Sequence, residues 1–125
     1  MERLFFTIGA VSAFVAVALG AFGAHGLKDR LSAEMLTIFE TAVRYQMYHA
    51  FALLAASWAS TRFSNSSQLI TISGWLFIIG TVLFSGSLYT LSLTEIRWLG
   101  AITPLGGLAF LAGWLCLAWA ALRAG

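Results

Sequence analysis

Four long apolar segments, separated by short polar loops, most constrain what this chain can fold into. Three of them, at about residues 4–24, 69–91 and 100–122, carry no charged side chain, and a fourth at about 41–61 carries only Arg44. Each is long enough to cross a hydrocarbon core of about 30 Å. Only 10% of the residues are charged and the mean hydropathy is +0.88, whereas a soluble domain carries about 25% charged residues. The sequence therefore predicts an all-α integral membrane protein, residues 1–125 forming one four-span antiparallel helical bundle with short loops.

The second apolar segment is expected to belong to a longer helix. Ser32 is a candidate N-cap, with Glu34 in the first turn behind it. A helix over residues 33–61 would be about 44 Å long, so residues 33–40 are expected to lie at the membrane surface or to extend beyond it. In the last segment, Thr103-Pro104 predicts either a helix start at Pro104 with Thr103 as cap, or a kink.

The first apolar segment has a second interpretation as a secretory signal. Arg3 precedes it, and Ala16-Val17-Ala18 resembles a cleavage site. Its apolar run is longer than a signal core of about 7–15 residues, which favours a membrane span. The orientation is not determined by charge, because three cations fall on each side of the membrane: Arg3, Arg62 and Arg123 on one, Lys28, Arg30 and Arg97 on the other.

Small residues recur on one face of three expected spans. At helical spacing these stripes are typical of membrane helices that approach closely, either within one chain or between subunits. They comprise Gly9, Ala13, Ala16, Gly20 and Ala24; then Ser73, Gly80, Ser87 and Thr94; then Gly106, Ala109, Gly113, Cys116 and Ala120.

Ionisable and polar side chains gather in the helix expected over residues 33–61. Glu40 and Arg44 are four residues apart and can pair along one helix face, and Tyr45 and His49 have the same spacing. Charges within a membrane are costly, so they indicate a functional site by default. Two roles stay open: a binding or proton site, or a structural pair in which Arg44 reaches the membrane surface.

Other chemistries have little support in the sequence. His25, His49 and Glu40 could in principle ligate a metal, but neither histidine has a ligand three or four residues away, so no metal and no cofactor is expected. A histidine at the end of a helix, as His25 is expected to be, can instead interact with the terminal carbonyls. The single cysteine gives no disulfide. Scattered Lys and Arg with a net charge of +2 give no nucleic-acid surface.

Four ordered motifs resemble one known family. They are Gly20-Ala21-Phe22-Gly23-Ala24-His25-Gly26-Leu27, Tyr45-Gln46-Met47-Tyr48-His49-Ala50, Leu83-Phe84-Ser85-Gly86-Ser87-Leu88-Tyr89 and Ile102-Thr103-Pro104-Leu105-Gly106-Gly107. By these blocks, which cover nearly the whole chain, the sequence is identified as a member of the domain of unknown function 423 family. That family includes bacterial inner-membrane proteins and eukaryotic transmembrane protein 256. The resemblance implies about four spans and supplies no catalytic residue.

An antiparallel topology would bring these motifs toward one face of the membrane. The candidate polar site therefore comprises His25, Glu40, Arg44, Tyr45, Gln46, Tyr48, His49, Ser85, Ser87, Tyr89 and Thr103. The leading hypothesis is a non-enzymatic binding, scaffold or accessory protein of the bacterial plasma membrane. Its expected partners are membrane lipids, and further copies or another membrane protein are possible partners. The alternative is a small oligomeric transporter or channel for a proton, ion or small anion, lined by Glu40, Arg44 and His49. A membrane-embedded enzyme ranks third.

Overall fold

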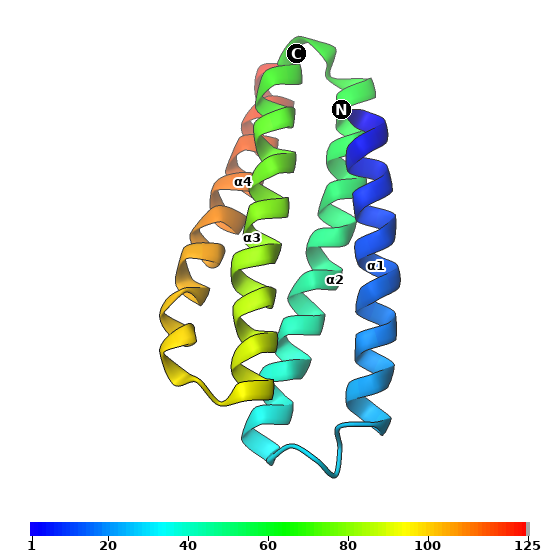
Figure 1. Cartoon of the computed structure of the whole chain (residues 1–125). Coiled ribbons are helices and arrows are strands. Elements are labelled where there is room, and N and C mark those ends of the chain that lie inside the picture. The colour runs from blue at the N-terminus through cyan, green and yellow to red at the C-terminus, as the bar shows by residue number, and fades with distance from the viewer. Residues whose placement is uncertain (125) are drawn as a thin grey trace.

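The computed structural model describes residues 1–124, in which four long helices run in alternating directions (Figure 1). Helix α1 covers Glu2–His25, α2 Ala33–Arg62, α3 Ser67–Thr94 and α4 Thr103–Arg123, with short 3₁₀ helices η1 (Ser64–Ser66) before α3 and η2 (Arg97–Ala101) before α4. The described residues contain no strand. The all-α antiparallel membrane bundle that the sequence predicts is therefore confirmed.

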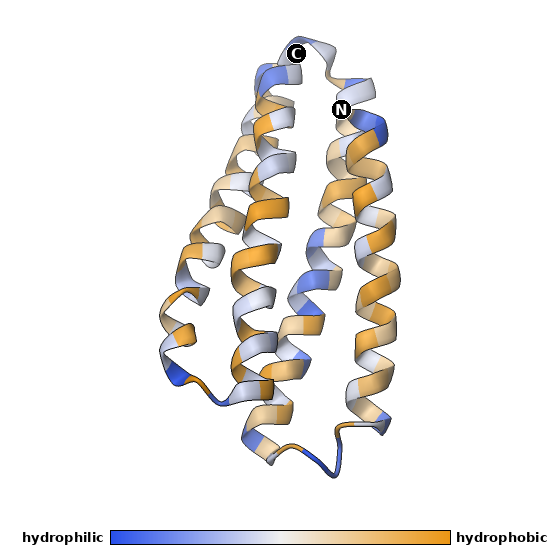
Figure 2. Cartoon of the chain, viewed as in Figure 1, coloured by the Kyte–Doolittle hydropathy of each residue, from blue (hydrophilic) through white to orange (hydrophobic). Residues whose placement is uncertain are grey.

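Three stretches are long and apolar enough to cross a membrane, and α2 is not among them. They are Glu2–His25, Ser64–Thr94 and Arg97–Arg123. Figure 2 shows why α2 differs: hydrophilic colour lies along part of it, well inside the bundle ends, where the other helices are mainly hydrophobic. The prediction that residues 41–61 form a fourth span is taken up below as a proposal.

The predicted start of α2 is confirmed, whereas the predicted start of α4 is not. Ser32 caps α2 as predicted, since its Oγ accepts a hydrogen bond from the backbone N–H of Met35 at 3.2 Å. The prediction that Thr103 caps a helix starting at Pro104 is wrong. Helix α4 begins at Thr103 itself, with Pro104 in its first turn, where the missing N–H has no helical partner to lose.

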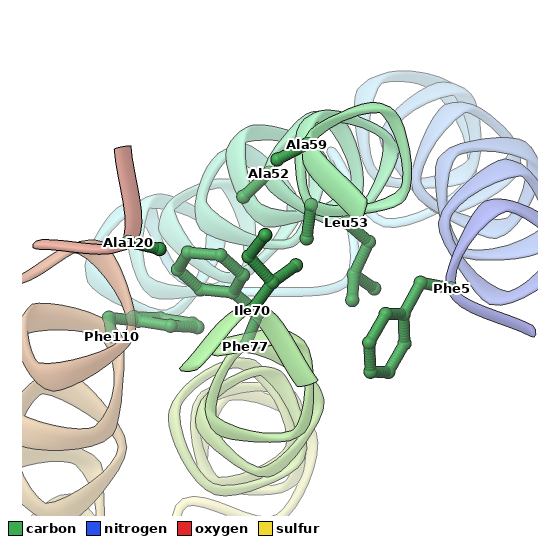
Figure 3. Packing of buried hydrophobic residues seen from close by; sticks show 9 residues of the cluster. Phe5, Ala52, Leu53, Ala59, Ile70, Phe77, Phe110 and Ala120 are labelled. Carbon is green, nitrogen blue, oxygen red and sulfur yellow. The ribbon is translucent and has the colours of Figure 1, made fainter. Parts of the chain in front are cut away.

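The four helices are arranged as an open row rather than a closed ring. Helices α2 and α3 form the central pair, α1 packs on α2, and α4 packs on α3. Figure 3 shows α1 and α4 on opposite sides of this central pair. A side of α2 therefore stays open between α1 and α4, and Glu40, Arg44 and Tyr48 are the candidate residues of α2 that are exposed.

Phenyl rings fill the space left by glycines on neighbouring helices. The ring of Phe5 on α1 lies where a Cβ at Gly74 would be. A Cβ at Gly113 would come within 2.8 Å of the Phe77 ring, and one at Gly80 within 2.5 Å of Phe110. These rings belong to the buried core shown in Figure 3. Several of the small-residue positions are thus contacts within one chain, since Gly9, Ala16, Ser73, Gly80, Gly106, Gly113 and Ala120 are buried.

One ion pair links the α3–α4 connection to α2. The Arg97 guanidinium donates to Glu34 Oε1 at 2.9 Å, and both side chains are largely exposed. No other ion pair occurs among residues 1–124. This pair lies at the end of the bundle that holds the α1–α2 loop (Figure 1).

Candidate functional site

A glutamine on α2 connects the backbone of α1 to a tyrosine on α3. Gln46 is 6% exposed, its Nε2 donates to the Ser12 carbonyl at 2.9 Å, and its Oε1 accepts from the Tyr89 hydroxyl at 2.6 Å. In the apolar interior of a membrane bundle such bonds hold helices together, because no water is present to replace them. Gln46 thus joins three helices through one side chain.

The serines of the third motif make similar interhelical bonds. Ser85 Oγ donates to the Ala42 carbonyl of α2 at 2.7 Å. The Ser87 and Thr103 hydroxyls lie 2.6 Å apart, and this bond links α3 to the first turn of α4. Ser87 also donates to the Phe84 carbonyl at 2.9 Å, so Thr103 is the donor in the bond to Ser87. The Thr103 hydroxyl, predicted to cap α4, therefore forms a hydrogen bond between α4 and α3.

His49 is enclosed by aromatic rings and has a partner at each nitrogen. It is 4% exposed, and its ring is stacked on Phe110 with centroids 3.4 Å apart. Trp114 Nε1 donates to His49 Nε2 at 3.2 Å, and His49 Nδ1 lies 2.8 Å from the Tyr45 carbonyl. Since the indole N–H can only donate, Nε2 must accept and Nδ1 must carry the proton. This geometry fits a neutral imidazole that serves packing.

Glu40, Arg44 and Tyr48 lie on the exposed part of α2, apart from this interior network. The pair predicted between Glu40 and Arg44 is not formed, since no carboxylate among residues 1–124 lies within 4.0 Å of the Arg44 guanidinium. The i,i+4 spacing permits an ion pair, but exposed side chains lose conformational entropy when they are held together. These residues instead line a groove of about 600 Å³ between α1 and α2, together with Gly20 and Met47.

A second groove opens on the other side of Tyr48, toward α4. Its volume is about 750 Å³, and its walls are almost entirely apolar. Tyr45, Phe84, Pro104 and Trp114 are among its lining residues. His49 also lines this groove, and both of its ring nitrogens already have hydrogen-bond partners within the protein.

His25 is separate from both groups. It is exposed at the last turn of α1, at the end of the bundle that holds the α1–α2 loop. Residues 1–124 contain no cluster of three or more histidine, cysteine or carboxylate side chains that could hold a metal. The predicted convergence is thus partial. The structure places seven of the candidate residues at contacts between helices: Tyr45, Gln46, His49, Ser85, Ser87, Tyr89 and Thr103. It places Glu40, Arg44 and Tyr48 on the exposed face of α2 and leaves His25 at the end of α1.

Several partners of the polar residues could not be identified from the sequence. Phe110 and Trp114 enclose His49, yet their positions in the last apolar segment suggest only core or membrane-interface residues. The Ser12 partner of Gln46 is a backbone carbonyl that its own α1 helix also uses. Because such a group has no side-chain signature, no pattern in the sequence points to it.

Comparison with known proteins gives relatives over nearly the full chain. The family described as "Protein of unknown function (DUF423)" matches residues 19–107. The UPF0382 membrane protein YwdK of Bacillus subtilis is 46% identical over 121 residues, which are 97% of this chain and 98% of that protein. A UPF0382 membrane protein of Haemophilus influenzae is 42% identical over 123 residues, covering 98% and 97% of the two chains.

The fold itself has no solved counterpart in this comparison, because no solved structure matches the chain. The relatives are named as membrane proteins without an activity. With the four motifs, the family match over residues 19–107 and full-length relatives in agreement, this chain belongs to the DUF423 family of membrane proteins.

Proposed function

We propose that the protein is a non-enzymatic binding or accessory component of the bacterial plasma membrane, and that its binding face is the exposed polar side of α2. One observation carries this proposal. Among residues 1–124, every buried side-chain nitrogen or oxygen has a hydrogen-bond partner within the protein. Interior groups that are already satisfied are poorly suited to act on a substrate. Among the candidate site residues along the helices, those left for interaction are Glu40, Arg44 and Tyr48 on the surface of α2.

The same proposal makes α2 the fourth span. Gly9 of α1 faces Ala50 and Leu53 of α2, and Gly20 faces Val43. These contacts keep the two helices side by side over most of the length of α1. If α1 crosses the membrane, α2 must cross with it, even though α2 is more polar. Reporter domains fused to the two termini should then lie on the same side of the membrane.

The transport alternative requires Glu40, Arg44 and His49 to line one pathway. In this chain His49 is enclosed between Phe110 and Trp114, whereas Arg44 lies in the groove on the α1 side of α2. A pathway through all three would need a second subunit and a different environment for His49. The geometry therefore favours binding over transport.

Ion flux distinguishes the two functions. The purified protein is reconstituted in liposomes that contain a pH-sensitive dye or a chloride-sensitive dye, and proton or chloride flux is recorded under an imposed gradient. We expect flux equal to that of protein-free liposomes for the unmodified protein and for Arg44→Ala. The unmodified protein could instead give flux above this background. If Arg44→Ala or His49→Phe then abolished that flux without unfolding the protein, transport would replace binding as the proposed function.

A further inference from the structure

We propose that the groove between α1 and α2 binds an aminophospholipid. Arg44 would hold the phosphate, Glu40 would accept hydrogen bonds from the primary ammonium group, and one acyl chain would lie along α1. This inference names a ligand for the binding face of α2 and so rests on the function proposed above.

The groove has the shape of a trough that continues along α1. The volume of about 600 Å³ beside Arg44 shares Val17 and Met47 with a neighbouring volume of about 510 Å³. The second volume is lined by Ala10, Ala13 and Phe51, among others, and has no charged lining residue. From Ala21 to Ala10 the trough spans about 16 Å of helix. Small side chains on α1 leave this space, and an extended hydrocarbon chain matches it.

The charges lie at one end of the trough only. Glu40 and Arg44 both line the first volume and are absent from the second. The guanidinium has no carboxylate within 4.0 Å in residues 1–124, and an exposed cation beside lipid is strongly favoured to acquire an anionic partner. A phosphate meets this requirement, and the acyl chain attached to it extends toward the apolar end.

The order of the two charges along α2 distinguishes among lipid headgroups. Glu40 is four residues closer than Arg44 to the start of α2, which corresponds to about 6 Å along the helix axis. In an aminophospholipid the ammonium group likewise lies beyond the phosphate, separated by a two-carbon ethanolamine. A choline headgroup has no N–H to donate to Glu40. A glycerol headgroup has no cation, so it would leave the Glu40 carboxylate without a cationic partner beside the phosphate that Arg44 holds.

Native mass spectrometry with defined lipids tests the assignment. The detergent-purified protein is mixed with equal amounts of palmitoyl-oleoyl phosphatidylethanolamine, phosphatidylglycerol and phosphatidylcholine, and the lipid that stays bound is identified. We expect phosphatidylethanolamine to be retained in preference to the other two. Arg44→Gln should reduce its retention about tenfold, because a charge-assisted hydrogen bond is lost. Arg44→Lys should restore part of it.

Two further variants separate the headgroup from the acyl chain. Glu40→Gln should retain phospholipid but lose the preference for ethanolamine over choline. Ala13→Leu should fill the apolar end of the trough and weaken retention of all three lipids alike, with both charges in place. Arg62→Gln removes an exposed cation from the far end of α2 and is the matched control that should leave retention unchanged.

The possible results have different consequences for the two proposals. Equal retention of the three lipids in the unmodified protein, or retention that Arg44→Gln leaves unchanged, would overturn the lipid assignment as ordinary solvation by membrane lipid. The flux measurement would be unaffected by either result, so the proposed binding function would stand without this ligand. Flux above background would instead overturn the proposed function, whatever lipid is bound.

Discussion

At the scale of single residues, the buried polar side chains of this protein mainly form hydrogen bonds between helices. Gln46 provides the clearest case, because it contacts α1 and α3 from its position on α2. Hydrogen bonds between membrane helices are typically worth about 0.6 kcal/mol, with values up to about 1.7 kcal/mol. A side chain that makes two such bonds should therefore have a measurable effect on stability.

Replacement of Gln46 by leucine should destabilise the bundle by about 1–2 kcal/mol, since two bonds are lost and the Tyr89 hydroxyl loses its acceptor. The free energy of unfolding can be measured by titration with sodium dodecyl sulfate in mixed micelles. Tyr89→Phe is the matched single change, and the double variant should be less destabilised than the sum of the two. Additive effects would show that the 2.6 Å contact between Tyr89 and Gln46 does not couple them.

At the scale of helices, the packing of α4 on α3 depends on one of two adjacent glycines. A Cβ at Gly106 would collide with the backbone of Phe84, whereas one at Gly107 would meet nothing within 4 Å. Both glycines lie in the same helix and share its backbone conformation. The two glycines therefore differ only in how closely the backbone of α3 approaches them.

This pair gives a controlled test of the α3–α4 contact. Gly106→Ala should destabilise the protein by about 1–3 kcal/mol, because backbone cannot move aside as a flexible side chain can. Gly107→Ala should be neutral or stabilising by up to about 1 kcal/mol, as alanine favours helix. Thermal unfolding followed by circular dichroism measures both. Equal effects at the two positions would be inconsistent with the close contact at Gly106.

The contact between the α3–α4 connection and α2 should also depend on pH. The Arg97 guanidinium, by hydrogen bond and charge, holds the pKa of the Glu34 carboxyl below its ordinary value of 4.5. The ion pair therefore contributes stability above that ordinary value, and the contribution is lost as the pH falls through the lowered pKa. Both side chains are 60% exposed or more, so solvent makes the contribution small.

Glu34→Gln should remove this part of the acid sensitivity. The expected result is a lower melting temperature than the unmodified protein at neutral pH and a smaller difference once the pH is well below 4.5. High salt should reduce the difference at neutral pH, because exposed charges are screened. If the difference in melting temperature between the two proteins does not change with pH or salt, the substitution acts through something other than the ion pair.

At the scale of the whole molecule, the open row leaves two sides of the bundle for lipid or for other subunits. Helix α1 packs on α2 and α4 packs on α3, and the outer helices lie on opposite sides of the central pair (Figure 3). A closed four-helix ring would instead place α1 beside α4. The two arrangements differ in which cysteine pairs can form a cross-link.

In a Cys116→Ser background, the pair Gly20→Cys and Val43→Cys should cross-link within one chain, since a Cβ at Gly20 would lie 3.4 Å from a Val43 methyl group. The pair Phe14→Cys and Leu115→Cys, on the outer surfaces of α1 and α4, should give no cross-link within a chain. Gel mobility after oxidation separates the products. An intramolecular product from the second pair would indicate a closed ring, whereas a dimer would identify a contact between copies.

The sequence by itself determined the class of this protein and the course of its chain. Apolar segments of spanning length have few stable structures in lipid, because each backbone N–H and C=O must be bonded within the segment, and the helix satisfies this locally. The cap at Ser32 follows from such local chemistry, whereas α4 begins at Thr103 and not at the predicted Pro104. The family resemblance also came from local motifs, which the matched region at residues 19–107 supports.

The tertiary structure alone decided how the polar residues are divided. Gln46 and Arg44 are two positions apart, yet Gln46 is bonded inside the bundle while Arg44 lines an open groove. That division depends on which neighbouring helix covers each part of α2. The open row, the enclosure of His49 by Phe110 and Trp114, and the unformed Glu40–Arg44 pair all follow from contacts between distant segments. Helical spacing specifies the direction of each side chain from its own axis, but only packing determines what it meets.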